Sequence, residues 1–240
     1  MLEIQTFGTV GLRNRDGMES QAQIVQSKRL ALLIYLALAP RRRCRRRDQV
    51  VTLFWPELDQ EHARGALSQA LRYLRRTLGD EAIITQGEDE VGLDRAVVGC
   101  DAVTFLTLCE TDQLEAALGL YQGPFLEGYF VADAGPEYER WVMAERAAFR
   151  QRAAQAAAVM AERAEGIPDL AAALRWARRG AAVLPGEEVP TARLIRLLDQ
   201  SGDRAGALRV YEELRERLLE EFQVAPSHET QALIARILAR

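Results

Sequence analysis

The sequence predicts a mainly helical protein with two parts, an α+β N-terminal domain over residues 1–98 and an all-α C-terminal domain of helical repeats over residues 99–240. Three observations predict this division. Strand-like segments bounded by turn residues occur only in the first part. From Asp101 onward the spacing of apolar residues is helical, and a short pattern recurs there after 34 residues. The chain is 48% hydrophobic, which is enough to fill a core in each part.

The N-terminal domain is expected to contain strands, three helices and a closing hairpin, in that order. Its first helix can be capped by Ser27 and is stopped by Pro40, which cannot continue a helix. The hairpin is indicated by the apolar segments on either side of "QGED", which supplies the turn. The predicted strands cover residues 2–7, 9–13 and about 23–26, the helices 27–39, 48–55 and 61–78, and the hairpin 82–94.

The C-terminal domain is expected to consist of helices alone. Residues 169–177, "DLAAALRWA", and residues 203–211, "DRAGALRVY", share Asp, two Ala, Leu and Arg at a separation of 34 residues. This period is typical of tetratricopeptide repeats, whose helical pairs stack because no single pair buries its own apolar face. The helices are predicted over residues 101–110, 112–121, 137–165, 168–183, 188–200, 204–221 and 228–239.

Positive charge is concentrated in one segment although the whole chain has a net charge of −4. Residues 41–47 read "RRRCRRR", in the predicted connection between the first two helices. Residues 41–78 carry ten arginines and only four acids. Concentrated charge of this kind favours a polyanionic partner such as nucleic acid. A solubilising loop without a partner and a surface that faces another protein are the alternatives.

The helix predicted over residues 61–78 has one apolar face and one basic face. Leucines at helical spacing form the apolar stripe, and Arg, Gln and His without any acid lie opposite. Arginine can bridge guanine O6 and N7, and glutamine can pair with adenine N6 and N7, so this face is suited to the major groove of DNA. A solvated basic helix is the alternative. The residues that we expect to contact bases are His62, Gly65, Ser68, Gln69, Arg72 and Arg76.

A short helix, a tight turn, a basic amphipathic helix and a hairpin together predict a winged helix-turn-helix domain. Arginines beside the groove-reading helix would neutralise phosphates, which makes binding strong and dependent on salt. The residues that we expect to contact phosphates are Arg41, Arg42, Arg43, Arg45, Arg46, Arg47, Arg64 and Arg75.

Longer stretches of the chain resemble a known family. Residues 1–98 resemble the OmpR-type winged helix domain, and "LFWPELDQEHARGALSQALRYLRRTLG" is similar to its form in the SARP-type antibiotic regulatory proteins. The remainder resembles the bacterial transcriptional activator domain that accompanies it. The matching pieces there are "CDAVTF", "LYQGPFLEGY", "ERWVMAER" and "SGDRAGALRVYEELRERLLEEFQVAPSHET".

The resemblance implies a sequence-specific DNA-binding transcriptional regulator, and an activator in particular. It implies binding to direct repeats near promoters and contact with RNA polymerase. The expected partners are therefore double-stranded DNA, RNA polymerase and a second copy of the chain, paired as a homodimer on direct repeats. The recognition helix of the family maps onto residues 62–78.

Two positions depart from the pattern of the family. Arg46 stands where the family usually has a Ser or Thr helix cap, and "EDEVGLD" replaces the aromatic Gly-Tyr pair that usually ends the wing. Glu88, Asp89 and Glu90 near the tip of the wing would repel phosphates. These acids oppose a minor-groove contact by the wing.

The remaining motifs exclude other classes of protein. The chain contains no Gly-rich phosphate loop, no GxSxG elbow and no HExxH pair, so we expect no enzyme activity, no cofactor and no metal. Its three cysteines form no CxxC pair, which favours a reduced, cytoplasmic setting. The apolar run over residues 30–39 is too short to cross a membrane.

Two further points are open at the level of sequence. The alternative function is a tetratricopeptide-type interaction scaffold whose winged helix makes protein rather than DNA contacts. Cys44 lies among arginines, which predicts a lowered thiol pKa and a redox-sensitive thiolate, with an inert cysteine as the alternative.

Overall fold

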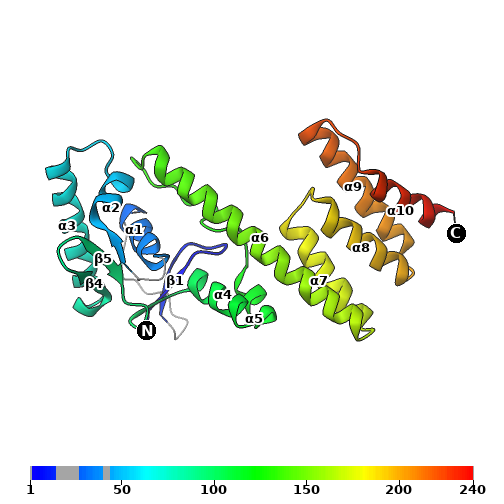
Figure 1. Cartoon of the computed structure of the whole chain (residues 1–240), viewed down its shortest axis with the longest axis horizontal. Helices are drawn as coiled ribbons and strands as arrows, with labels where there is room; N and C mark the ends of the chain where they lie inside the picture. Colours follow the sequence, from blue (N-terminus) through cyan, green and yellow to red (C-terminus); the bar gives the residue numbers. More distant parts are fainter. Residues whose placement is uncertain (1, 15–26, 40–43, 240) are drawn as a thin grey trace. The chain divides into compact units, whose positions relative to one another are not determined.

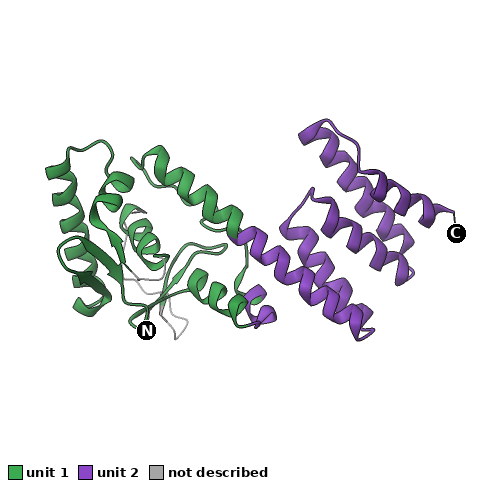
Figure 2. Ribbon diagram, in the orientation of Figure 1, with its two compact units in different colours: residues 1–111, 119–148 green, residues 112–118, 149–240 purple. Residues whose placement is uncertain are grey.

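The computed structural model describes residues 2–14, 27–39 and 44–239. The chain forms two compact units (Figure 2), the first made of residues 1–111 and 119–148 and the second of residues 112–118 and 149–240. The first unit combines two small sheets with helices, and the second is all helical (Figure 1). The predicted fold class, a winged helix region followed by helical repeats with helix predominating, is confirmed. The third strand predicted near residues 23–26 lies outside the described residues.

The first sheet joins the beginning of unit 1 to a segment almost one hundred residues further on. Strand β1 (Leu2–Gln5) pairs antiparallel with β2 (Gly11–Asn14) and parallel with β6 (Val98–Cys100), in the order β2-β1-β6. The first two strands were predicted, whereas β6 and its parallel pairing were not. Because β6 ends directly before helix α4 (Asp101–Glu110), the sheet fixes where that helix begins.

The start of α4 is held by a buried carboxylate. Asp101 accepts hydrogen bonds from the backbone N–H of Thr6 at 2.8 Å, from the hydroxyl of Thr6 at 2.6 Å and from the N–H of Phe7 at 3.2 Å. It also accepts one from the N–H of Ala102 in the first turn of the helix. A buried carboxylate is tolerated only when its oxygens are satisfied in this way, so Asp101 ties the end of β1 to α4.

Three helices pack beside the second sheet of unit 1. They are α1 (Ser27–Ala37), α2 (Arg47–Phe54) and α3 (Gln60–Leu78). Helix α1 is the most deeply buried, since Ala31, Leu32, Leu33 and Ile34 are fully inaccessible to solvent. Within the described ranges, no helix is both long and apolar enough to cross a membrane.

The second sheet contains the predicted hairpin and one strand that was not predicted. Strands β4 (Ile83–Gln86) and β5 (Glu90–Leu93) form the hairpin after a 3-10 turn at Asp80–Ala82, and β3 (Cys44–Arg46) adds to the other edge of β5. The order is β3-β5-β4, and both pairings are antiparallel. The arginine cluster therefore does not run as a loop throughout, because Cys44–Arg46 form a sheet strand and Arg47 begins α2.

Residues beyond position 98 complete the core around the three helices. The ring of Tyr138 lies 5.4 Å from that of Phe54 in α2, and Trp141 meets Tyr35 of α1 edge to face at 4.9 Å. Both residues belong to the first part of α6 (Pro136–Gly166). The predicted boundary after residue 98 follows the change in sequence pattern and stays a prediction; packing places residues 101–111 and 119–148 in unit 1.

Unit 2 is a stack of antiparallel helices. After the later part of α6 its helices pack mainly on their neighbours in sequence, around buried residues such as Ala173, Ile195 and Leu198. The remaining helices of this region are α5 (Leu114–Leu120), α7 (Leu170–Val183), α8 (Glu188–Gln200), α9 (Arg204–Phe222) and α10 (His228–Leu238).

The 34-residue repeat has a structural explanation. Asp169 and Asp203 occupy the same place in it, and each caps the helix that follows by accepting from the backbone N–H three residues later. Ala173 and Ala207, also equivalent, are both fully buried. A side-chain cap and a small crossing residue thus recur together, as expected for a repeat of helical pairs.

The last helix covers the core of unit 2 with part of its apolar stripe. Ile234 and Ile237 are buried against α8 and α9, whereas Leu238 is 55% exposed. The stripe therefore seals the final repeat, as capping helices in repeat proteins do.

We expect Trp141→Ala to destabilise unit 1 although the residue lies more than forty positions after the winged helix sequence. Trp141 contacts Tyr35, Phe125 and Tyr138, and losing a packed indole costs about 3 kcal/mol or more. Urea unfolding followed by circular dichroism measures the change. Met143→Ala, on an exposed position of the same helix, is the control, and equal effects of the two changes would contradict the packing described here.

Candidate nucleic-acid interface

Helix α3 has well-defined ends. Asp59 precedes the helix and accepts a hydrogen bond from the N–H of His62 at 3.0 Å, which satisfies a free donor of the first turn. At the other end Gly79 has a φ of 103°, a backbone conformation that glycine adopts without strain, and its N–H donates to the carbonyl of Arg75. The helix therefore begins and ends where the sequence predicts.

The buried face of α3 is the predicted leucine stripe with two alanines added. Leu67, Leu71 and Leu74 are at most 1% exposed, and Ala63 and Ala70 lie beside them. This packing fixes the rotation of the helix and directs the opposite face to solvent. All six residues predicted to contact bases are exposed: His62, Gly65, Ser68, Gln69, Arg72 and Arg76.

Two of these six residues already have a polar partner for their side chain. The Nδ1 of His62 lies 2.7 Å from a carboxylate oxygen of Asp59, which leaves the Nε2 edge of the ring for another contact. Hydrogen bonds from His62 lower the pKa of Asp59. The hydroxyl of Ser68 donates to the carbonyl of Arg64 at 2.8 Å, so its oxygen can only accept from a partner.

Gly65 and Gln69 have no such partner. A methyl group built on Gly65 would meet nothing within 4 Å, so packing inside the protein does not require a glycine there. Close approach of another molecule to this face of α3 would explain the glycine. The Gln69 amide forms no hydrogen bond with any residue that the structure describes, which leaves both its donor and its acceptor free.

The predicted phosphate contacts divide into several groups. Arg41, Arg42 and Arg43 lie outside the described residues. Arg46 is exposed at the position before α2 and, as the departure from the family pattern indicates, provides no side-chain cap. Arg64 is exposed and forms an ion pair with Asp48 at 2.9 Å, which a phosphate could displace because such surface pairs are weak.

Arg45 has a different role from the predicted one. Its Nε donates to the carbonyl of Tyr35 at 2.9 Å and its Nη2 to that of Leu38 at 3.0 Å, while the guanidinium stacks 3.8 Å from the Tyr35 ring. Burial lowers its pKa. The group is thus committed to the end of α1, and its bonded N–H donors are not available to a phosphate. The physical reason is that successive side chains of a strand point to opposite faces.

Cys44 also differs from its sequence-based interpretation. The neighbouring arginines predict a lowered thiol pKa, whereas burial and the nearby carboxylate of Glu90 raise it. The alternative of an inert cysteine is therefore the better description.

The remaining arginines surround a surface pocket at the second half of α3. Its volume is about 560 Å³, and its lining includes Arg47 from α2, Ser68 and three arginines of α3. Arg75 is tethered there by a long contact of 3.5 Å to the carbonyl of Ile83, and Arg76 lies over the Tyr73 ring. The lining residues are Arg47, Ser68, Leu71, Arg72, Arg75, Arg76, Gly79 and Asp80.

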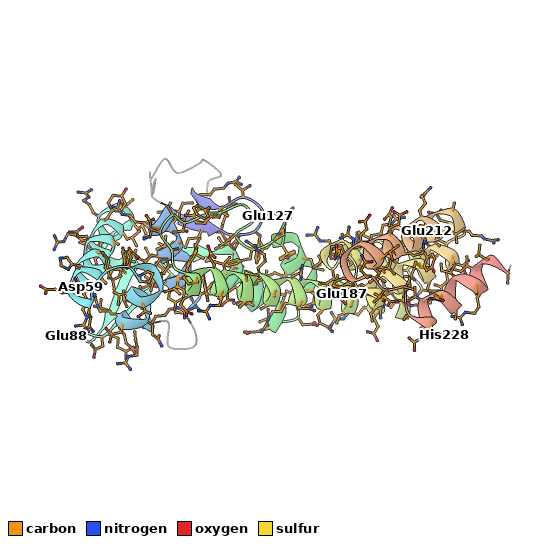
Figure 3. The ribbon with its side chains drawn as sticks, turned by 90° about the horizontal axis from the view of Figure 1, so that it is seen from above. Asp59, Glu88, Glu127, Glu187, Glu212 and His228 are labelled. Carbon is orange, nitrogen blue, oxygen red and sulfur yellow. The ribbon has the colours of Figure 1, made fainter. Side chains whose placement is uncertain are left out.

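The wing carries the acids that the sequence indicates. Glu88 and Asp89 are exposed at the tip between β4 and β5, and Figure 3 shows Glu88 and Asp59 projecting from unit 1. The carbonyl of Asp89 accepts from the N–H of Arg47 at 2.8 Å, so the tip also supports the first turn of α2. Repulsion from the phosphates makes the tip a poor DNA contact.

Arg95 was not singled out from the sequence. Its guanidinium donates to the carbonyls of Ala37 at 2.8 Å and Ala39 at 2.7 Å, at the same helix end as Arg45. A helix that is followed in the sequence by Pro40 and not by a glycine leaves several carbonyls to be satisfied, and this was the available signal.

The comparisons with known proteins agree with this architecture. The family model described as "Bacterial transcriptional activator domain" matches residues 109–238. Among solved structures, Mycobacterium tuberculosis EmbR in complex with a low affinity phosphopeptide matches 99% of this chain with a TM-score of 0.70 and 20% sequence identity. The match covers 65% of the EmbR chain, so this chain spans less than two thirds of it. The comparison with curated proteins gave no match.

The winged helix region, the helical repeats and the exposed basic helix together define a class of bacterial transcriptional regulators. Since the family model covers more than half of the sequence, the chain belongs to the bacterial transcriptional activator domain family. The SARP-type arrangement expected from the sequence, a winged helix region followed by this domain, is confirmed.

We expect neighbouring arginines of the cluster to behave differently when replaced. Arg45→Met should lower the free energy of unfolding by about 2 kcal/mol or more, because two carbonyls lose charged donors. Arg46→Met should change it by less than about 0.5 kcal/mol, because the side chain is exposed. Urea titrations of both variants test this, and equal stabilities would show that Arg45 does not hold the end of α1.

Proposed function

We propose that the protein is a sequence-specific DNA-binding regulator that inserts α3 into the major groove and activates transcription. One observation carries the proposal. The outer face of α3 is exposed, contains arginine, glutamine and histidine, and has no acid from His62 to Gly79. A helix of this kind beside a hairpin has the geometry with which winged helix domains approach DNA.

The first half of α3 is suited to contact base edges. Gln69 is exposed, and both the NH2 donor and the carbonyl acceptor of its amide are free. They match the paired acceptor and donor that adenine presents in the major groove. Gly65, one turn earlier on the same face, leaves room for a close approach. The Nε2 edge of His62 lies at the beginning of this face.

The arginines around this face position the protein on the duplex by contacting phosphates. Arg46 and Arg64 are exposed and contribute charge without stabilising the core, unlike Arg45. Phosphate contacts of this kind supply affinity that does not depend on sequence and that falls as salt rises.

We expect Gln69→Ala to relax sequence preference. The loss should be about 1–3 kcal/mol at a preferred site, with little change on random DNA, because a base contact discriminates and a phosphate contact does not. Binding titrations on a duplex that the protein selects from a random pool, and on unselected duplex, measure both. Gln200→Ala, the same change at an exposed position of α8, is the control, and an equal loss on both DNAs would contradict base contact by Gln69.

The alternative function is a helical-repeat scaffold whose winged helix binds protein. The apolar pockets among the helices of unit 2 are consistent with a scaffold, but they say nothing against DNA binding by α3. A gel-shift titration with random duplex at two salt concentrations separates the two. The proposal requires measurable binding at low salt that weakens as salt rises, whereas absence of binding at low salt would favour the scaffold.

We also propose contact with RNA polymerase, which follows from membership of a family of transcriptional activators. In vitro transcription with purified polymerase on a template that carries the selected site tests it. An activator raises transcript yield, and unchanged yield at full occupancy of the site would leave DNA binding without activation.

Binding to direct repeats is the third part of the proposal. One recognition helix contacts only a few base pairs, which are too few to select a promoter among the competing sites of a genome. Two copies, paired head to tail on direct repeats, would double the number of base pairs that are contacted. Half-sites in such arrangements are separated by about one helical turn, or about 10–11 base pairs.

We expect cooperative occupation of two such repeats. Footprinting should show both repeats filling together, with weaker occupation when the spacer changes by about half a turn, because the second copy then faces the other side of the duplex. Equal binding at every spacing would contradict pairing and indicate a monomer that binds each site alone.

A further inference from the structure

The pocket beside the second half of α3 has an uneven distribution of charge. As far as the structure describes its lining, Arg47, Arg72, Arg75 and Arg76 contribute four guanidinium groups, and Asp80 is the single acid. None of the four forms an ion pair with a described residue. Like charges held around one depression repel, so the arrangement favours an anion inside it.

One polar atom of the lining lacks a partner that a folded protein normally provides. The Nε of Arg47 is buried and makes no hydrogen bond within the described part of the chain. A buried donor without a partner costs free energy, and such atoms in native proteins point to a missing ligand or water. Because the Nε–H of Arg47 is a donor, its missing partner is an acceptor.

The dimensions and donors suit a phosphate group. A volume of about 560 Å³ exceeds that of one tetrahedral oxyanion and leaves space for the groups attached to it. Guanidinium groups bind phosphate through paired N–H donors, and several of them from two helices can surround one phosphate. The Ser68 oxygen, which can only accept, lies on the lining but adds no donor.

We propose that this pocket holds one phosphate of the DNA backbone and fixes the depth and register of α3 in the major groove. The inference rests on the proposed function and assigns a more specific role to the same surface. A phosphate of DNA is favoured over a free phosphate because the pocket is lined by both α3 and the first residue of α2. Both elements would face the same strand of the DNA backbone when α3 lies in the groove.

The proposal divides α3 into two parts. Arg72 and Arg76, predicted from the sequence to contact bases, lie on the pocket lining and bind the phosphate. His62, Gly65 and Gln69 do not line it and are left to contact bases. This division agrees with helix-turn-helix proteins in general, in which the N-terminal residues of the recognition helix contact base edges.

The test uses the full chain and a duplex selected from a random pool, in which single phosphates are replaced by neutral methylphosphonates. For the wild type, one linkage per half-site should reduce affinity about tenfold more than its neighbours, as expected when a charge-assisted contact is lost. For Arg47→Gln and Arg75→Gln, the same linkage should have no special effect, because its contact is already absent. Each of these variants should also lower the salt slope by about 1.

Two controls separate the pocket from general electrostatics and from misfolding. Arg209→Gln removes the same charge from an exposed position of α9 and should keep the wild-type response to each linkage. Circular dichroism checks that Arg47→Gln is folded, and Arg75→Gln tests the same pocket from another helix. If the variants respond to every linkage as the wild type does, the pocket holds no backbone phosphate.

The remaining outcomes show whether the phosphate comes from DNA or from a free ligand, and whether the proposed function itself fails. Inorganic phosphate, titrated without DNA at constant ionic strength, should change the arginine Nε–H signals in NMR spectra only weakly. Saturation at low millimolar phosphate, without coupling to any DNA linkage, would assign the pocket to a free phosphorylated ligand and overturn the DNA source. If the wild-type protein binds no DNA at all, the proposed function itself is refuted.

Discussion

The end of helix α1 is the constraint on which the N-terminal unit depends. Its last carbonyls face a buried region, and the residues around them, from Leu36 to Ala39, include three that are at most 3% exposed. Arg45 donates to the carbonyls of Tyr35 and Leu38, and Arg95 donates to those of Ala37 and Ala39. A helix that ended there without donors would leave acceptors unsatisfied, at a cost comparable to several lost hydrogen bonds. The two arginines also tie β3 and the connection after β5 to the helix.

This constraint explains why neighbouring arginines of "RRRCRRR" have different roles. Because Arg45 points inward from β3, Arg46 points outward, and Arg47 begins α2 with its N–H bonded to the wing. One residue of the cluster stabilises the fold, the next is available to solvent and the third lines the pocket beside α3. The like charges of Arg45, Arg46 and Arg47, the arginines of the cluster that the structure describes, are therefore tolerated because they lie on different faces.

The sequence predicts most of this protein where the signal is local. Leucine spacing locates α3, and the recurring Asp and Ala of the repeat correspond to real caps and crossings. Strands β3 and β6 escape prediction because three residues carry no recognisable alternation. For the site, exposure of all six predicted base contacts follows from the stripe. The commitment of Arg45 and the pocket that includes Arg47 depend on contacts between distant segments, which no spacing rule contains.

Packing in the N-terminal unit changes how the activator region is understood. The family match begins at residue 109, yet Tyr138 and Trp141, well inside it, pack against Phe54 of α2 and Tyr35 of α1. Phe54 belongs to α2, which carries Arg47 at its first turn and packs against α3. The aromatic residues of the activator region thus support the same helices that present the proposed DNA contacts. A winged helix cut from this chain at residue 98 would lose those contacts and expose Phe54, so residues 1–98 and the first part of the activator region fold as parts of one compact unit.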